Sequence, residues 1–120
     1  MTGRSESGGL SIRERIAKIQ RELRDGALTP DLTRESLVTL TALLGNVNDE
    51  LRDADHEYKL VLRECLNTHE KANRARIEAE VSPQYQRARE AKDTFTLAQE
   101  MIRSCRAYLR SLDEEMRLAR

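Results

Sequence analysis

Apolar residues follow two heptad series along most of the chain, and these series are the strongest structural signal in the sequence. In both, the steps alternate between three and four residues without a slip. A mean spacing of about 3.5 residues keeps one face of a helix against a partner helix. The pattern therefore predicts two long helices that pack along a shared seam. The first series is Leu37, Leu40, Leu44, Val47, Leu51, Ala54, Tyr58, Val61, Cys65, Thr68, Ala72, Ala75 and Ala79. The second is Ala88, Ala91, Phe95, Ala98, Ile102, Cys105, Leu109, Leu112, Met116 and Ala119.

Capping signals place the helix ends. Ser11 and Glu14 fit a capping box, and Gly26 is expected to close the first helix in the left-handed conformation. Thr29 and Pro30 supply an N-cap and a first-turn proline for the second helix. We expect a flexible tail over 1–10 and one helical domain over 11–120, with helices over 11–25, 30–80 and 83–119.

Ser82 and Pro83 are predicted to end the second helix and start the third. The break allows either a tight hairpin or one kinked rod. Small residues on both sides of it favour the hairpin, because alanine lets two backbones approach closely. The expected fold is all-α: a short N-terminal helix followed by a long antiparallel coiled-coil hairpin. A reversal at Ser82 would set the acidic segment 49–57 beside the arginines of the third helix, which are Arg103, Arg106 and Arg110.

Further apolar residues lie off the seam and widen the apolar face beyond what two helices cover. We therefore expect a homo-oligomer in which the first helix and the start of the second pack on a neighbouring copy. The expected contacts between copies are Ile12, Ile16, Ile19, Leu23, Leu43, Leu97, Met101 and Tyr108.

Composition narrows the classes of function. The 120 residues are 38% hydrophobic and 3% aromatic, and the formal net charge is zero, so no overall field attracts DNA or a membrane. No run of 18 apolar residues is present, which argues against a membrane span. The polar N-terminus lacks the apolar stretch of a secretory signal and predicts a cytoplasmic protein.

Candidate chemistry is sparse. No glycine-rich phosphate loop is present, and His56 and His69 lack the repeated carboxylate-histidine motifs of a metal site. We expect no enzyme activity, no cofactor, no metal and no small-molecule substrate. Cys65 and Cys105 fall on the two series and are expected to be neighbours, either as reduced core residues or as a redox-sensitive pair.

Basic side chains gather around Ser82, where they could bind the phosphates of single-stranded DNA or an acidic partner protein. A solvated helix face is the alternative interpretation. Aromatic side chains usually add stacking surfaces for bases, and only Tyr85 lies near this part of the sequence. The candidate binding residues are Arg74, Arg76, Arg87, Arg89 and Lys92.

The stretches 79–92 (AEVSPQYQRAREAK) and 101–109 (MIRSCRAYL) resemble small helical phage recombination mediators of the UvsY type. The resemblance covers at most residues 50–120. It implies an oligomer that binds single-stranded DNA and helps to load a partner recombinase. The alternative is a protein–protein adaptor or a structural or regulatory coiled-coil protein, such as a phage scaffold, tail or anti-defence factor, without nucleic-acid binding.

Overall fold

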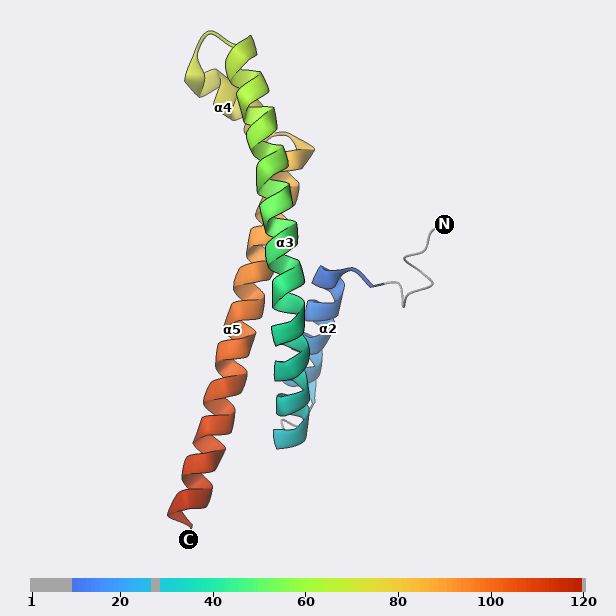
Figure 1. Ribbon diagram of the computed structural model, residues 1–120, viewed down its shortest axis with the longest axis vertical. Helices are drawn as coiled ribbons and strands as arrows, with labels where there is room; N and C mark the ends of the chain where they lie inside the picture. Colours follow the sequence, from blue (N-terminus) through green and yellow to red (C-terminus); the bar gives the residue numbers. More distant parts are fainter. Residues whose placement is uncertain (1–9, 27–28, 120) are drawn as a thin grey trace. The chain divides into compact units, whose positions relative to one another are not determined.

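The computed structural model describes residues 10–26 and 29–119, and in this part of the chain all regular structure is α-helical. The all-α prediction is confirmed. Of the expected tail over 1–10, only Leu10 is among the described residues. The helices are α2 (Ile12–Asp25), α3 (Pro30–Thr68), α4 (Ala72–Glu80) and α5 (Pro83–Leu118) (Figure 1).

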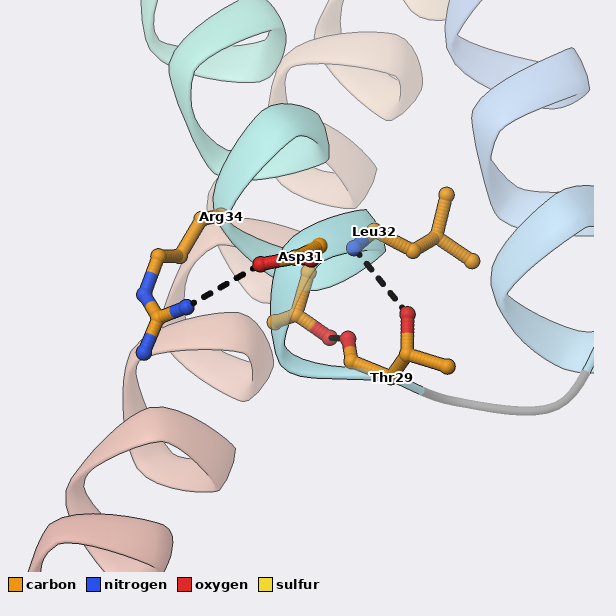
Figure 2. A network of polar contacts seen from close by, with 5 residues as sticks. Thr29, Asp31, Leu32 and Arg34 are labelled. Carbon is orange, nitrogen blue, oxygen red and sulfur yellow. Dashed lines mark hydrogen bonds and ion pairs between the residues drawn. The ribbon is translucent and has the colours of Figure 1, made fainter.

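The predicted caps start α2 and α3. The Ser11 hydroxyl accepts the Glu14 N–H at 3.2 Å, and the Glu14 carboxylate accepts the Ser11 N–H at 2.8 Å, which completes the capping box. At α3, the Thr29 hydroxyl accepts the Leu32 N–H at 3.1 Å, directly before Pro30 (Figure 2). Both helices therefore begin where the sequence indicated, because their first free N–H groups have local acceptors.

Gly26 closes α2 in a way that the sequence did not predict. Its φ of −88° is not left-handed, and its N–H donates to the Glu22 carbonyl at 3.1 Å. A Cβ at this position would lie 2.8 Å from that carbonyl oxygen. Glycine is needed here for a close approach of backbone to backbone, and the expected left-handed conformation is wrong.

The predicted single helix over 30–80 is wrong, because residues 69–71 separate α3 from α4. At the end of α3, the Thr68 hydroxyl donates to the Glu64 carbonyl at 2.8 Å, and the Cys65 carbonyl accepts the His69 N–H at 3.0 Å, with His69 Nδ1 also 3.0 Å away. The chain turns back at 69–71, and α4 runs back along α3 (Figure 1).

Ser82 and Pro83 mark a helix boundary, as predicted, but not the reversal. The Ser82 hydroxyl donates to the Ala79 carbonyl at 2.6 Å and accepts the Tyr85 N–H at 3.2 Å, so it closes α4 and caps α5. Tyr85 contacts Tyr58 of α3, only three residues into α5. The hairpin therefore turns about thirteen residues earlier than Pro83.

Contacts divide the described chain into two compact units. Unit 1 comprises α2, α3 up to Asn46 and α5 from Thr96; unit 2 comprises the residues from Val47 to Phe95. In each unit α3 and α5 contact one another, which agrees with a long helix pair. The single domain expected over 11–120 stays a prediction.

Unit 1 has a core of branched and bulky side chains contributed by all three of its helices. Four of the residues expected to contact another copy belong to this core, namely Ile16, Ile19, Leu43 and Met101, so they pack inside one chain. The other four, Ile12, Leu23, Leu97 and Tyr108, are half-buried. The core of unit 1 is Ile16, Ile19, Leu40, Leu43, Ala98, Met101, Ile102 and Cys105, with Thr33 and Ser36.

Unit 2 has a core of small side chains. Ala75 and Ala79 of α4 are completely buried, as is Ala54 of α3. Alanine at these positions lets the α4 backbone lie close to its neighbours, as the alanines in the sequence indicated. The core of unit 2 is Val47, Ala54, Ala75, Ala79, Ala91 and Thr94.

Candidate nucleic-acid interface

The five predicted binding residues all lie in unit 2 and all are exposed. Arg74 and Arg76 belong to α4, and Arg87, Arg89 and Lys92 belong to α5. The structure therefore places them in one compact unit, although their local partners differ.

Arg87 is held by an acidic side chain of α3. Its Nη1 lies 2.9 Å from Glu57 Oε2, and this hydrogen bond is the main reason why the pKa of Arg87 is raised. The charges of Glu50 and Asp53 act in the same direction. The guanidinium of Arg87 is thus already neutralised by its own chain, and of the five it is the least suited to bind an external phosphate.

The acidic segment 49–57 therefore does not take the partners that the sequence predicted. Asp49 pairs with Arg52, and Asp55 pairs with Lys59 at 3.0 Å, in addition to the pair between Glu57 and Arg87. The expectation that Arg103, Arg106 and Arg110 would neutralise it is wrong. The reason is the earlier reversal, which brings Arg87 at the start of α5 beside this segment.

Two tyrosines meet next to the exposed arginines. The ring centroids of Tyr58 on α3 and Tyr85 on α5 are 5.0 Å apart, with an interplanar angle of 59°. Arg89 Nη1 donates to the Tyr85 hydroxyl at 3.1 Å, and its guanidinium carbon lies 5.8 Å from the centroid of the Tyr85 ring. Both rings are half-buried and the arginine is exposed, so the group faces solvent.

A second arginine, Arg76 of α4, acts on Tyr58. Burial raises the pKa of Tyr58, and the charge of Glu80 adds to this effect, whereas the charge of Arg76 lowers the pKa. Arg76 and Glu80 of α4 therefore both lie near the Tyr58 hydroxyl. We call Tyr58, Tyr85, Arg76 and Arg89 the tyrosine–arginine cluster.

Tyr58 is the residue of this cluster that sequence reasoning missed. It occupies a seam position, which indicated only a packing role. With the reversal placed at Ser82, Tyr58 would lie far from Tyr85 along the hairpin. The reversal at 69–71 brings the two rings together, so the aromatic surface is larger than the single Tyr85 that the sequence indicated.

Arg103, Arg106 and Arg110 line a different groove, which lies in unit 1 between α3 and α5. Its cavity measures about 380 Å³, and Thr41 and Leu44 form its α3 side. Among the described residues, none of these arginines has an ion-pair partner. The remaining lining residues are Gln99, Ile102 and Ala107.

Both cysteines are free thiols. Cys105 is buried in unit 1, and burial raises the pKa of its thiol, which suits a reduced core residue. Cys65 is half-buried in unit 2. Their expected proximity stays a prediction. Over residues 10–26 and 29–119, no group of three or more acidic, histidine or cysteine side chains is arranged to hold a metal ion.

Comparison of the chain with models of known families, with curated proteins and with solved structures gives no match. The resemblance to UvsY-type mediators accordingly stays a prediction. None of the described helices combines the length and apolar character needed to cross a membrane.

Proposed function

We propose that this protein is a non-enzymatic helical protein that binds single-stranded DNA through the tyrosine–arginine cluster of unit 2. The observation that carries the proposal is the contact of Tyr58 with Tyr85 beside the Arg89 guanidinium. We also propose that the protein helps to load a partner recombinase, and this part rests on the UvsY-type resemblance.

The cluster combines the two groups that single-strand binding needs. Bases stack on aromatic rings whatever their identity, and this stacking does not depend on the nucleotide sequence. Arginine adds charge and planar donors for phosphate oxygens. The half-buried tyrosines supply the rings, and Arg76 and Arg89 flank them with exposed charge.

The charge balance of unit 2 sets the expected strength of binding. Glu80 lies near Tyr58 and Asp93 lies near Arg89, so acidic groups partly offset the cluster. Of the five predicted binding residues, four have no carboxylate partner within hydrogen-bonding distance among the described residues: Arg74, Arg76, Arg89 and Lys92. Each phosphate contact to a single strand contributes about −0.7 to the slope of log affinity against log salt concentration, so we expect a slope of roughly −3.

A titration of fluorescently labelled oligothymidylate, followed by anisotropy at several salt concentrations, tests the proposal. Replacing both Arg76 and Arg89 by alanine is expected to weaken binding by about tenfold or more and to reduce the salt slope by about 1.4. Arg87→Ala is the matched control. It removes the same kind of charge from the same unit, but from a residue that Glu57 already neutralises, so its effect is expected to be smaller.

Tyr85→Leu separates stacking from charge. Because it removes an aromatic face and no charge, it is expected to weaken binding on the order of tenfold without changing the salt slope. Absence of salt-dependent binding by the unmodified protein would contradict the proposal. Equal losses for Arg87→Ala and Arg89→Ala would show that the cluster is not the binding surface.

A protein–protein adaptor is the second candidate, and α4 carries the observation that favours it. Ile77, on the side of α4 away from its buried alanines, is 58% exposed, and Val81, which follows the last residue of the helix, is 75% exposed. Exposed apolar pairs of this kind suit contact with another protein. Failure to bind single strands at low salt would favour this role.

A further inference from the structure

The apolar stripe of α5 loses its cover toward the C-terminus. Ala98, Ile102 and Cys105 are buried in unit 1, whereas Leu109 and Leu112 on the same stripe are half-buried. Met116, the next position, is 61% exposed. In Figure 1 the last turns of α5 run past the first turn of α3, within unit 1. The heptad pattern thus continues beyond the part of α5 that the other described helices cover.

An open cavity of about 370 Å³ lies beside this stripe. Leu23 of α2 forms one side, and Met101, Cys105 and Tyr108 of α5 form another. It is lined mainly by carbon and sulfur atoms, so a flexible apolar side chain is the kind of group that would fill it. The remaining lining residues are Gln20, Arg24, Thr33, Leu97, Glu100 and Ser104.

Charges beside the stripe indicate which helix could cover it. Arg106 and Asp113 occupy the same flanking position of successive heptads, and among the described residues neither has an ion-pair partner. In an antiparallel pair of identical helices, equivalent flanking positions face one another across the seam. A two-fold axis near residues 110 and 111 then sets Arg106 of each copy against Asp113 of the other.

The same register matches the apolar positions. Leu109 of one copy lies opposite Leu112 of the other, and Met116 lies opposite Cys105, next to the cavity. A parallel pair would instead set Arg106 against Met101 and Asp113 against Tyr108, so neither charge would meet its opposite. Charge and apolar pattern therefore agree on one arrangement only.

We propose that two copies of this chain associate antiparallel through the C-terminal half of α5, with Met116 of each copy entering the cavity beside Cys105 of the other. The residues involved belong to unit 1, so this inference is independent of nucleic-acid binding by unit 2.

Sedimentation equilibrium of the full chain tests the proposal. The unmodified protein is expected to reach twice the 13.8 kDa of one chain as its concentration rises. Arg106→Asp alone and Asp113→Arg alone each turn both attractive pairs into repulsive ones, and each is expected to weaken association on the order of tenfold. An equimolar mixture of the two variants restores both pairs of opposite charge and is expected to recover the affinity of the unmodified protein.

Met116→Gln tests the apolar part of the contact, with Leu118→Gln as its matched control. Leu118 is 88% exposed but lies off the stripe, so its replacement is expected to leave association unchanged, whereas Met116→Gln weakens it about tenfold. Both residues are exposed in the single chain, so circular dichroism should show unchanged helix content. The proposal would be overturned by a monomer at millimolar concentration or by a mass other than that of a dimer. It would also be overturned by equal effects of the two glutamine variants, or by a mixture of the charge variants that does not recover the affinity of the unmodified protein.

Discussion

Gly26 and Gly45 differ in the space around the backbone. At Gly26, an added Cβ would lie 2.8 Å from the Glu22 carbonyl oxygen. At Gly45, which is exposed within α3, an added Cβ would have no atom within 4 Å. Gly45 therefore makes no close contact that requires glycine, and there glycine only loosens the helix.

Alanine at these two positions is expected to change stability in opposite directions. Gly45→Ala should raise the free energy of unfolding by about 0.5–1 kcal/mol, because alanine loses less backbone entropy in a helix. Gly26→Ala should lower it by about 1 kcal/mol, because the Glu22 carbonyl must shift. Urea unfolding measures the change in the free energy of unfolding for each variant, and each variant is the control for the other. A gain at Gly26 would show that the end of α2 adapts without strain.

The α4 helix depends on small residues. Its nine residues end at Glu80, one side buries Ala75 and Ala79 completely, and the other exposes Ile77. A helix of this length is not stable alone in water, so packing must hold it in place. The break at 69–71 that creates α4 contains neither proline nor glycine, and this is why the sequence did not reveal it.

Ala79→Leu should therefore destabilise the protein by about 1–3 kcal/mol, because the larger side chain forces the α4 backbone away from its neighbours. Ile77→Leu, which changes an exposed residue of the same helix, should stay within about 0.5 kcal/mol of the unmodified protein. Thermal and urea unfolding measure the difference. Similar small effects at both positions would mean that α4 does not pack through its alanine face.

At the scale of the whole chain, the two units bury different kinds of side chain. Unit 1 buries Ile16, Leu40 and Ile102, among others, whereas the core of unit 2 consists of alanines with Val47 and Thr94. Burial of apolar area stabilises by roughly 25 cal/mol per Å². Unit 2 therefore has less hydrophobic stabilisation for a similar length of helix.

Amide hydrogen exchange should report this difference. Amides of α4 are expected to exchange fastest among the helices of unit 2, and those around Leu40 and Ile102 in unit 1 should be protected longest, because local opening follows the apolar contacts that it breaks. Exchange measured by mass spectrometry on peptides from each unit resolves the order. Slower exchange in α4 than around Leu40 would contradict it.

The candidate site was predictable only in part. Exposed arginines are visible in the sequence, and their positions in α4 and α5 followed from helical spacing. Tyr58 could not be assigned to the site, because its partner Tyr85 is 27 positions further along the chain and the pairing depends on where the chain turns. For the same reason, the sequence predicted that Arg103, Arg106 and Arg110 lie beside the acidic segment 49–57. In the structure, carboxylates of this segment pair with Arg87 of α5 and with Arg52 and Lys59 of α3.

The sequence by itself determined that the described chain is helical, where α2, α3 and α5 begin, and which residues can form seams. These features depend on interactions within a few residues, such as the Ser11 capping box and the Ser82 cap. Interactions between such near neighbours can be inferred from the sequence alone. Only the tertiary structure decided where the chain reverses and hence which side chains meet. The reversal lies about twelve residues before Ser82, and this shift changes which side chains pair along the hairpin. Packing between residues distant in the sequence therefore determines where the chain turns.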